Sequence, residues 1–346
     1  MGGPILDSRL RQPARRASIP GMGSSPISLK DVKRAAARLR PHVSPTPLRR
    51  YAPLDEELGG GVRVWVKHEN HLPTNAFKAR NGLSALSALP EEKRRRGVVA
   101  ATRGNHGQGL AWAGALLGIP VTICVPKGNN PEKNAAMRGY GAELIESGRD
   151  YDESVSVADE LVRDRGLTLV HSTNHPEIIA GAGTLALEIA EQAPELDALV
   201  VAVGGGSQAV GALTVFRELR PDVRIYAVQA EGASAIHDSY HAGQQISHDS
   251  ADTFADGLAT RRGYELTLAP LREGLADFVT VSDAEIAEAI RALLRTTHNL
   301  AEGAGAAGLA GLIKLKERLA GKSVAVILSG SNIDEATLQR VLCREL

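Results

Sequence analysis

Short apolar runs alternate with helical patterns along most of the chain, and this alternation limits the possible folds more than any other feature. The runs have the length and composition of buried strands. They are residues 62–66, 97–102, 120–125, 142–146, 167–172, 197–203, 223–229 and 323–329. The clearest helical patterns are residues 105–118, 184–192, 284–297 and 306–320. The alternation predicts an α/β fold in which helices cover parallel sheets.

The composition is that of an ordinary globular chain. Its 346 residues are 43% hydrophobic, which supplies a sizeable core. The 40 Lys and Arg residues balance the 40 Asp and Glu residues, which argues against a surface for nucleic acid or anionic lipid. Without an apolar run of membrane-spanning length or an apolar signal core, we expect a cytoplasmic protein that binds a small molecule.

Four turns that carry glycine or asparagine follow predicted strands. They are residues 74–82 (TNAFKARNG), 102–109 (TRGNHGQG), 204–211 (GGGSQAVG) and 329–334 (SGSNID). Ligands bind at the carboxyl ends of strands in open α/β sheets, so all four are candidates for one crevice.

The turn at residues 204–211 has two interpretations. Glycines between a buried strand and a helix let backbone N–H groups converge on a phosphate. The same residues contain the dinucleotide pattern Gly204-x-Gly206-x-x-Ala209, and Glu231 follows the next strand, where a ribose-binding acid would lie. The second interpretation predicts an NAD-dependent oxidoreductase, but it explains none of the other three turns.

Lys78 lies in the first turn of a predicted helix, next to Phe77. A cation near the positive end of a helix dipole and an apolar ring should have a lowered pKa. An uncharged amine can form a Schiff base with an aldehyde. The alternative is a lysine that reaches the surface. A phosphate loop together with a Schiff-base lysine is the minimum needed to bind pyridoxal phosphate.

Five motifs in order carry a family resemblance: AFKAR, TRGNHGQ, VGGGSQ, EGAGAAG and LSGSNID. Together they resemble the fold type II pyridoxal-phosphate enzymes, in particular the branch of threonine/serine dehydratases and serine racemases. The similarity covers roughly residues 35–340. It implies a fold like the tryptophan synthase β subunit, with two open, largely parallel sheets and the cofactor in a crevice between a large and a small domain.

The expected domain organisation combines composition with this resemblance. Residues 1–28 are rich in Gly, Pro, Ser and Arg and predict a flexible N-terminal arm. Residues 29–96 and 174–346 would form the large cofactor-binding domain, and residues 97–173 the small domain. The resemblance further implies a homodimer.

The resemblance also implies roles for individual residues. Lys78 would hold the cofactor as a Schiff base and act as acid and base at Cα, and Ser329 would meet the pyridine nitrogen. The cofactor-binding positions are Phe77, Lys78, Asn105, Gly204, Gly205, Gly206, Ser207 and Ser329. The positions for the substrate carboxylate are Thr102, Arg103, Gly104, Asn105 and His106. Glu302 would lie at the edge of the cofactor.

The sequence departs from the family pattern near Lys78 and in the second turn. Small or glycine residues close to the lysine are replaced here by Asn75, Ala76 and Asn81. These changes affect the entrance to the substrate site. Arg103 stands where racemases of this branch carry a serine that protonates the opposite face of the substrate. This replacement weakens the racemase interpretation.

The family's cation site is only partly present. Glu231 stands at the position of the first ligand, and Ala235 could offer its carbonyl oxygen. His237 occupies the place of a usual aspartate, and imidazole is a poor ligand for Mg²⁺ or Ca²⁺. We therefore predict no metal.

The predicted activity is that of a pyridoxal-phosphate-dependent dehydratase, or ammonia-lyase. The substrate would be a 3-hydroxy L-amino acid, first threonine or serine, and the products a 2-oxo acid and ammonia. An amino-acid racemase or β-replacement synthase with the same cofactor is one alternative. The oxidoreductase described above is the alternative of another class.

Overall fold

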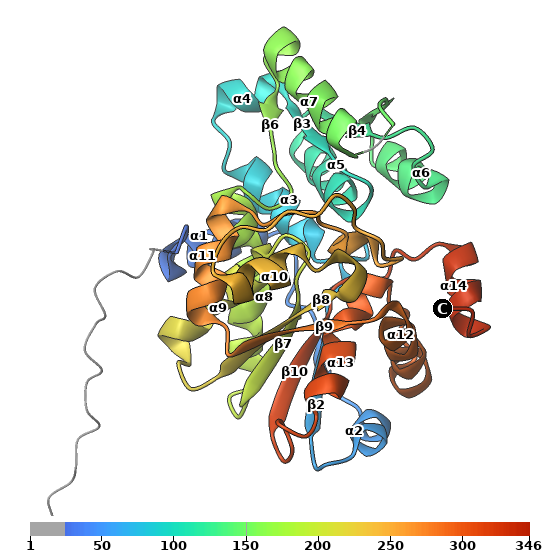
Figure 1. The fold of residues 1–346 in the computed structure, drawn as a ribbon. Coiled ribbons are helices and arrows are strands. Elements are labelled where there is room, and N and C mark those ends of the chain that lie inside the picture. Colours follow the sequence, from blue (N-terminus) through green and yellow to red (C-terminus); the bar gives the residue numbers. More distant parts are fainter. Residues whose placement is uncertain (1–24, 150) are drawn as a thin grey trace, which may run out of the picture.

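The computed structural model describes residues 25–149 and 151–346, and these form two sheets (Figure 1). The larger sheet has the order β1 (Leu48–Arg50), β2 (Arg63–His68), β10 (Ser323–Leu328), β7 (Ala198–Ala202), β8 (Arg224–Ala230) and β9 (Asp277–Val281). The smaller has the order β5 (Glu143–Glu146), β4 (Val121–Val125), β3 (Val98–Ala101) and β6 (Thr168–Leu169). Only β1 pairs antiparallel with its neighbour. The predicted α/β fold with two largely parallel sheets is confirmed.

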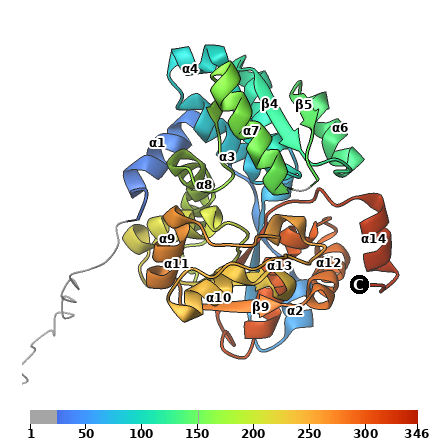
Figure 2. The same ribbon diagram turned by 45° about the horizontal axis from the view of Figure 1, so that its top comes forward.

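Helices cover both faces of each sheet (Figures 1 and 2). One core of the larger sheet includes α2 (Ala52–Leu58), α12 (Asp283–Thr297), α13 (Gly303–Leu315) and α14 (Glu335–Leu342). The other includes α1 (Leu29–Leu39), α8 (Pro176–Gln192), α9 (Ser207–Leu219), α10 (Ala235–Ala242) and α11 (Glu265–Gly274). The smaller sheet packs against α3 (Lys78–Ser87), α5 (Asn105–Leu117) and α6 (Pro131–Gly139), and against α7 (Tyr151–Arg165). The exposed α4 (Glu91–Arg96) and the short 3-10 turns η1 (Glu69–His71), η2 (Glu231–Ala233) and η3 (Asp256–Leu258) complete the elements.

Helix α3 is held very close to α5. A Cβ atom added to Gly82 would lie 2.3 Å from the carbonyl oxygen of Gly109, and one added to Gly109 would lie 2.3 Å from that of Lys78. Glycine at these two positions lets the two backbones approach closely. Because α3 also packs against α8, it connects the helical layers of the two sheets. The division into domains at residues 96 and 174 stays a prediction.

The N-terminal boundary lies before α1. Residues 1–24 of the predicted arm lie outside the described residues. Residues 25–28, which were predicted to be part of the flexible arm, belong to the packed structure instead. Ile27 is buried, and the Ser28 side chain caps α1. None of the helices in the described ranges is long and apolar enough to cross a membrane.

Candidate active site

Lys78 is the first residue of α3, which confirms the predicted helix start. Its Nζ donates a hydrogen bond to the carbonyl oxygen of Ser172 at 3.0 Å and lies 5.0 Å from the centre of the Phe77 ring. Burial lowers the pKa of the Lys78 amine to about 8. A larger fraction of this amine is therefore uncharged near neutral pH than in a solvated lysine, as a nucleophile requires.

The loop after β10 lies directly beside the loop that carries Lys78. The N–H of Phe77 donates to the carbonyl oxygen of Ser329 at 2.9 Å, and the N–H of Ser331 donates to that of Asn75 at 2.9 Å. The Ser329 side chain is buried, and its hydroxyl donates to the carbonyl oxygen of Ala304 at 3.3 Å. The structure thus brings together the motifs AFKAR and LSGSNID, which lie about 250 residues apart in the chain.

Two asparagines near Lys78 depart from the family pattern. Asn75 has a φ of 54°, in the left-handed region that favours glycine and tolerates asparagine. Its backbone conformation therefore explains why asparagine can replace glycine there. Asn81 is fully buried in α3, and neither of its amide atoms has a hydrogen-bond partner in the described protein. Nothing in the structure explains that second replacement.

Asn105 at the start of α5, Glu302 just before α13 and Asn332 in the loop after β10 form one hydrogen-bonded group. The Nδ2 of Asn105 donates to Oε1 of Glu302 at 2.6 Å, and the Nδ2 of Asn332 donates to Oδ1 of Asn105 at 2.7 Å. Burial raises the pKa of the Glu302 carboxyl. The Asn105 amide keeps a second N–H and a second lone pair for another partner. Its orientation is set before any ligand binds.

The predicted carboxylate loop, residues 102–106, runs into the first turn of α5. The N–H of Gly104 donates to Oγ1 of Thr102 at 3.2 Å, while the side chain of Arg103 is exposed. The buried His106 ring makes a hydrogen bond through Nε2 with the carbonyl oxygen of Val170 at 2.9 Å. Burial lowers the pKa of His106 to about 3, so the ring is neutral. The backbone N–H groups at the start of α5 are suited to a carboxylate.

The glycines of the third turn are packed too closely for side chains. A Cβ atom on Gly204 would lie 2.0 Å from the carbonyl oxygen of Gly257, and one on Gly205 would lie 2.0 Å from Oγ1 of Thr173. Gly206 has a φ of 98°, which favours glycine. The loop can thus lie against two neighbouring segments before α9 begins at Ser207.

The carbonyl oxygens of this loop accept hydrogen bonds, whereas its N–H groups have no acceptor among the described residues. The hydroxyl groups of Thr260 and Thr267 donate to the carbonyl oxygens of Gly204 and Gly205 at 3.0 and 2.8 Å. Within the described ranges, no protein group accepts the N–H groups of residues 204–207. Unpaired N–H groups at a helix N-terminus are suited to a phosphate.

Two adjacent residues connect the lysine with the glycine-rich loop. The carbonyl oxygen of Ser172 accepts the hydrogen bond from Lys78, and the side chain of Thr173 lies against Gly205. The amine and the glycine-rich loop therefore lie at the same segment after β6. Neither Ser172 nor Thr173 is predicted from the sequence, although a signal exists, because Asn174 follows them in the turn after the apolar run 167–172.

The weak cation candidates Glu231 and Ala235 lie in η2 and at the start of α10. Glu231 is exposed in η2, and the carbonyl oxygen of Ala235 accepts a hydrogen bond from the Ser239 hydroxyl at 2.6 Å. His237 Nδ1 lies 2.8 Å from Oδ1 of Asp238. In the described part of the chain, no group of three or more His, Cys, Asp and Glu residues could hold a metal ion.

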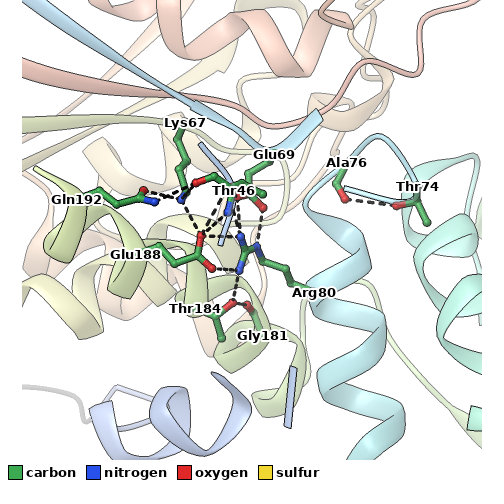
Figure 3. Close-up of polar contacts among 10 residues, drawn as sticks. All are labelled: Thr46, Lys67, Glu69, Thr74, Ala76, Arg80, Gly181, Thr184, Glu188 and Gln192. Atoms are coloured by element: carbon green, nitrogen blue, oxygen red, sulfur yellow. Dashed lines mark hydrogen bonds and ion pairs between the residues drawn. The ribbon is translucent and has the colours of Figure 1, made fainter. Parts of the chain in front are cut away.

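A buried ionic network lies next to α3 (Figure 3). Arg80 Nε lies 2.7 Å from Oε2 of Glu69, and Arg80 Nη1 lies 2.6 Å from Oε1 of Glu188. Lys67 Nζ lies 2.6 Å from the other oxygen of Glu188. Burial alone would lower the pKa of Arg80, but the two carboxylates raise it, so the guanidinium stays charged. The network fixes the side chain two residues after Lys78.

None of these four charged residues is predicted from the sequence. A signal exists, because Lys67 directly follows the apolar run 62–66, and Glu188 lies inside the apolar helical pattern 184–192. A charged side chain on a buried face needs a partner of opposite charge. The sequence shows that partners are needed, but it does not show which residues they are.

Comparison with known proteins relates the chain to one family. Residues 39–330 match the family model described as pyridoxal-phosphate dependent enzyme. The chain is 37% identical over 320 residues to the L-threonine ammonia-lyase of Thermotoga maritima, covering 92% of this chain and 79% of that one. It is 38% identical over 307 residues to the L-threo-3-hydroxyaspartate ammonia-lyase of a Pseudomonas species, covering 89% and 96%. The structure of maize serine racemase is similar with a TM-score of 0.86 and 30% identity, over 92% of this chain and 97% of that one.

Proposed function

The chain belongs to the pyridoxal-phosphate dependent enzymes, and within this family we propose that it is an ammonia-lyase for a 3-hydroxy L-amino acid. L-Threonine and L-serine are the first substrates we propose. One observation carries the proposal: the segment Ser172–Thr173 contacts both the Lys78 amine and the glycine-rich loop. An amine of lowered pKa and the glycine-rich loop thus lie at one site, as a pyridoxal-phosphate enzyme requires.

The residues present fit the cofactor. The N–H groups of residues 204–207 are unpaired within the described protein and would hold the phosphate. Lys78 would attach through Nζ, and the buried Ser329 hydroxyl would face the pyridine nitrogen. When bound, pyridoxal phosphate withdraws electrons from the Cα atom of the amino acid. The same fit favours the phosphate interpretation of residues 204–211 over the dinucleotide interpretation.

The chain's own groups would bind the substrate and move its protons. The N–H groups of Arg103, Asn105 and His106, within the carboxylate loop 102–106, would hold the substrate carboxylate and so orient Cα toward Lys78. The Lys78 amine would remove the proton from Cα, and the hydroxyl group would leave Cβ; this proton and this hydroxyl together account for one water. The resulting unsaturated amine hydrolyses to a 2-oxo acid and ammonia. No oxidant or reductant is needed.

The proposal is tested by incubating the purified holoenzyme with L-threonine, L-serine and L-threo-3-hydroxyaspartate and measuring 2-oxo acid and ammonia. We expect turnover of at least one of the three. No turnover of any would contradict the lyase, and a nicotinamide-dependent oxidation would support the oxidoreductase. The visible absorption of a lysine–pyridoxal Schiff base tests the cofactor independently. The predicted cytoplasmic homodimer is a separate proposal.

Arg103 leads to a prediction that separates elimination from racemisation. Because an arginine cannot give up its proton at physiological pH, it is a poor group for proton exchange on the second face of the substrate. We expect L-serine to give pyruvate with little D-serine. Chiral chromatography of the reaction mixture checks this. D-serine formed as fast as pyruvate would instead support the racemase alternative.

Ser329→Ala should separate cofactor binding from turnover. The variant keeps Lys78 and residues 204–207, so we expect it to retain the bound cofactor. It loses the hydroxyl that would align the ring, so kcat should fall by about 10-fold or more, in line with the loss of one orienting hydrogen bond. Absorption spectra and steady-state kinetics on the same sample measure both. Unchanged kcat would show that Ser329 does not face the ring.

A further inference from the structure

Beside the candidate site, one ion pair joins a helix that packs on the smaller sheet to a 3-10 turn of the larger-sheet region. Lys133 of α6 places Nζ 2.5 Å from Oδ2 of Asp256, the first residue of η3. The Lys133 side chain is only 11% exposed, whereas that of Asp256 is 47% exposed. This pair joins residues 97–173 to the rest of the chain. A pair with one nearly buried member is screened less by solvent than a surface pair.

The lysine end of this pair lies along the predicted carboxylate loop. A Cβ atom added to Gly104 would lie 3.1 Å from Cδ and 3.9 Å from Nζ of Lys133. The Lys133 stem therefore supports the backbone of the loop from one side. Burial would lower the pKa of the Lys133 amine, but Asp256 raises it, so the amine is charged.

The aspartate end of the pair is connected to the glycine-rich loop. The carbonyl oxygen of Gly257 lies 2.0 Å from the position of a Cβ atom on Gly204. The Thr260 hydroxyl, just after η3, donates to the carbonyl oxygen of Gly204 at 3.0 Å. A displacement of Asp256 would thus be transmitted to the loop with the unpaired N–H groups.

We propose that Lys133 is a positioning residue, whose ion pair with Asp256 sets the carboxylate loop 102–106 against the glycine-rich loop 204–207. The inference rests on the proposed function for its meaning in catalysis. Without the pair, the two loops would no longer be tied together at this edge, and the substrate carboxylate would bind in a less defined position. Even a small displacement of a bound substrate can lower the reaction rate by a large factor.

The first test measures the loops directly in the holoenzyme by hydrogen–deuterium exchange. In Lys133→Gln and in Asp256→Asn, we expect faster exchange in peptides that cover residues 102–108 and 256–260. Arg138→Gln is the matched control, because Arg138 also lies on α6 but pairs with Glu146 inside the smaller-sheet region. Equal exchange in Lys133→Gln and the parent, or the same increase in Arg138→Gln, would overturn the proposal. This readout does not depend on turnover.

The second test measures kinetics with the best 3-hydroxy amino acid. We expect Lys133→Gln to lower kcat/KM about 10-fold to 100-fold, mainly through KM, with the cofactor absorption unchanged. Lys133→Arg keeps the positive charge and should therefore retain most of the parent kcat/KM. The double variant Lys133→Gln with Asp256→Asn should have a kcat/KM no lower than that of the less active single variant. Strictly additive losses would contradict a direct pair. An inactive parent enzyme would contradict the proposed function alone, since the exchange test still decides the positioning role.

Discussion

Replacement of Lys78 by alanine is expected to lower turnover by about 10³-fold or more and to make the cofactor removable by dialysis. The variant loses the cofactor's attachment point and the group that accepts the Cα proton, and general acid–base catalysis alone contributes about 10²–10⁴-fold. The measurement is 2-oxo acid formation, together with the visible absorbance of the protein before and after dialysis.

Two further lysine variants make this result specific. Lys78→Arg keeps a positive charge at the start of α3 but cannot form the Schiff base, so we expect it to be as inactive as the alanine variant. Lys127→Ala removes an exposed lysine and should retain the parent activity. Substantial turnover by Lys78→Ala would show that another residue carries the chemistry.

Arg80→Met is expected to lower the free energy of unfolding by about 3–5 kcal/mol, as does the removal of one partner from a buried ion pair. The substitution keeps a long side chain but leaves the buried carboxylate of Glu69 and the largely buried one of Glu188 without their main partner. Denaturant unfolding followed by circular dichroism measures the change. Because α3 carries both Arg80 and Lys78, we also expect weaker retention of the cofactor.

The control for this variant is Arg138→Met. Arg138 pairs with Glu146, but both side chains are exposed, at 52% and 38%. Exposed ion pairs contribute about 0–1 kcal/mol, so the control should unfold almost like the parent. If Arg80→Met were as stable as Arg138→Met, the buried network would not stabilise α3, and the role assigned to it would be wrong.

Every strand predicted from an apolar run is present. Six of them are largely buried parallel strands, which carry continuous apolar residues, whereas β5 and β6 have no buried residue and β6 is only two residues long. The prediction missed β1 and β9. β1 is only three residues long and mostly exposed, and β9 is an edge strand with an irregular burial pattern. The start of α8 was also missed, since its first half contains glycines and alanines without a clear helical period. Weak local patterns explain these errors.

For the candidate site, the sequence predicted the loops better than their contacts. Lys78 begins a helix, as its position after a turn indicated, and residues 204–206 form a close-packed loop before a helix. The sequence did not predict that Glu302 and Asn332 would orient Asn105. The cofactor and carboxylate roles assigned to these residues stay predictions.

The sequence by itself determined the α/β class, the family motifs and the helix start at Lys78. These features follow from local patterns, because strand length, glycine in tight turns and helix periodicity depend on residues close together in the chain. Only the tertiary structure decided that Ser172–Thr173 contacts both Lys78 and Gly205, that Arg80 pairs with Glu188, and that Lys133 reaches Asp256. Such contacts join residues that are far apart in the chain, and their partners are chosen by how the two sheets and their helices pack.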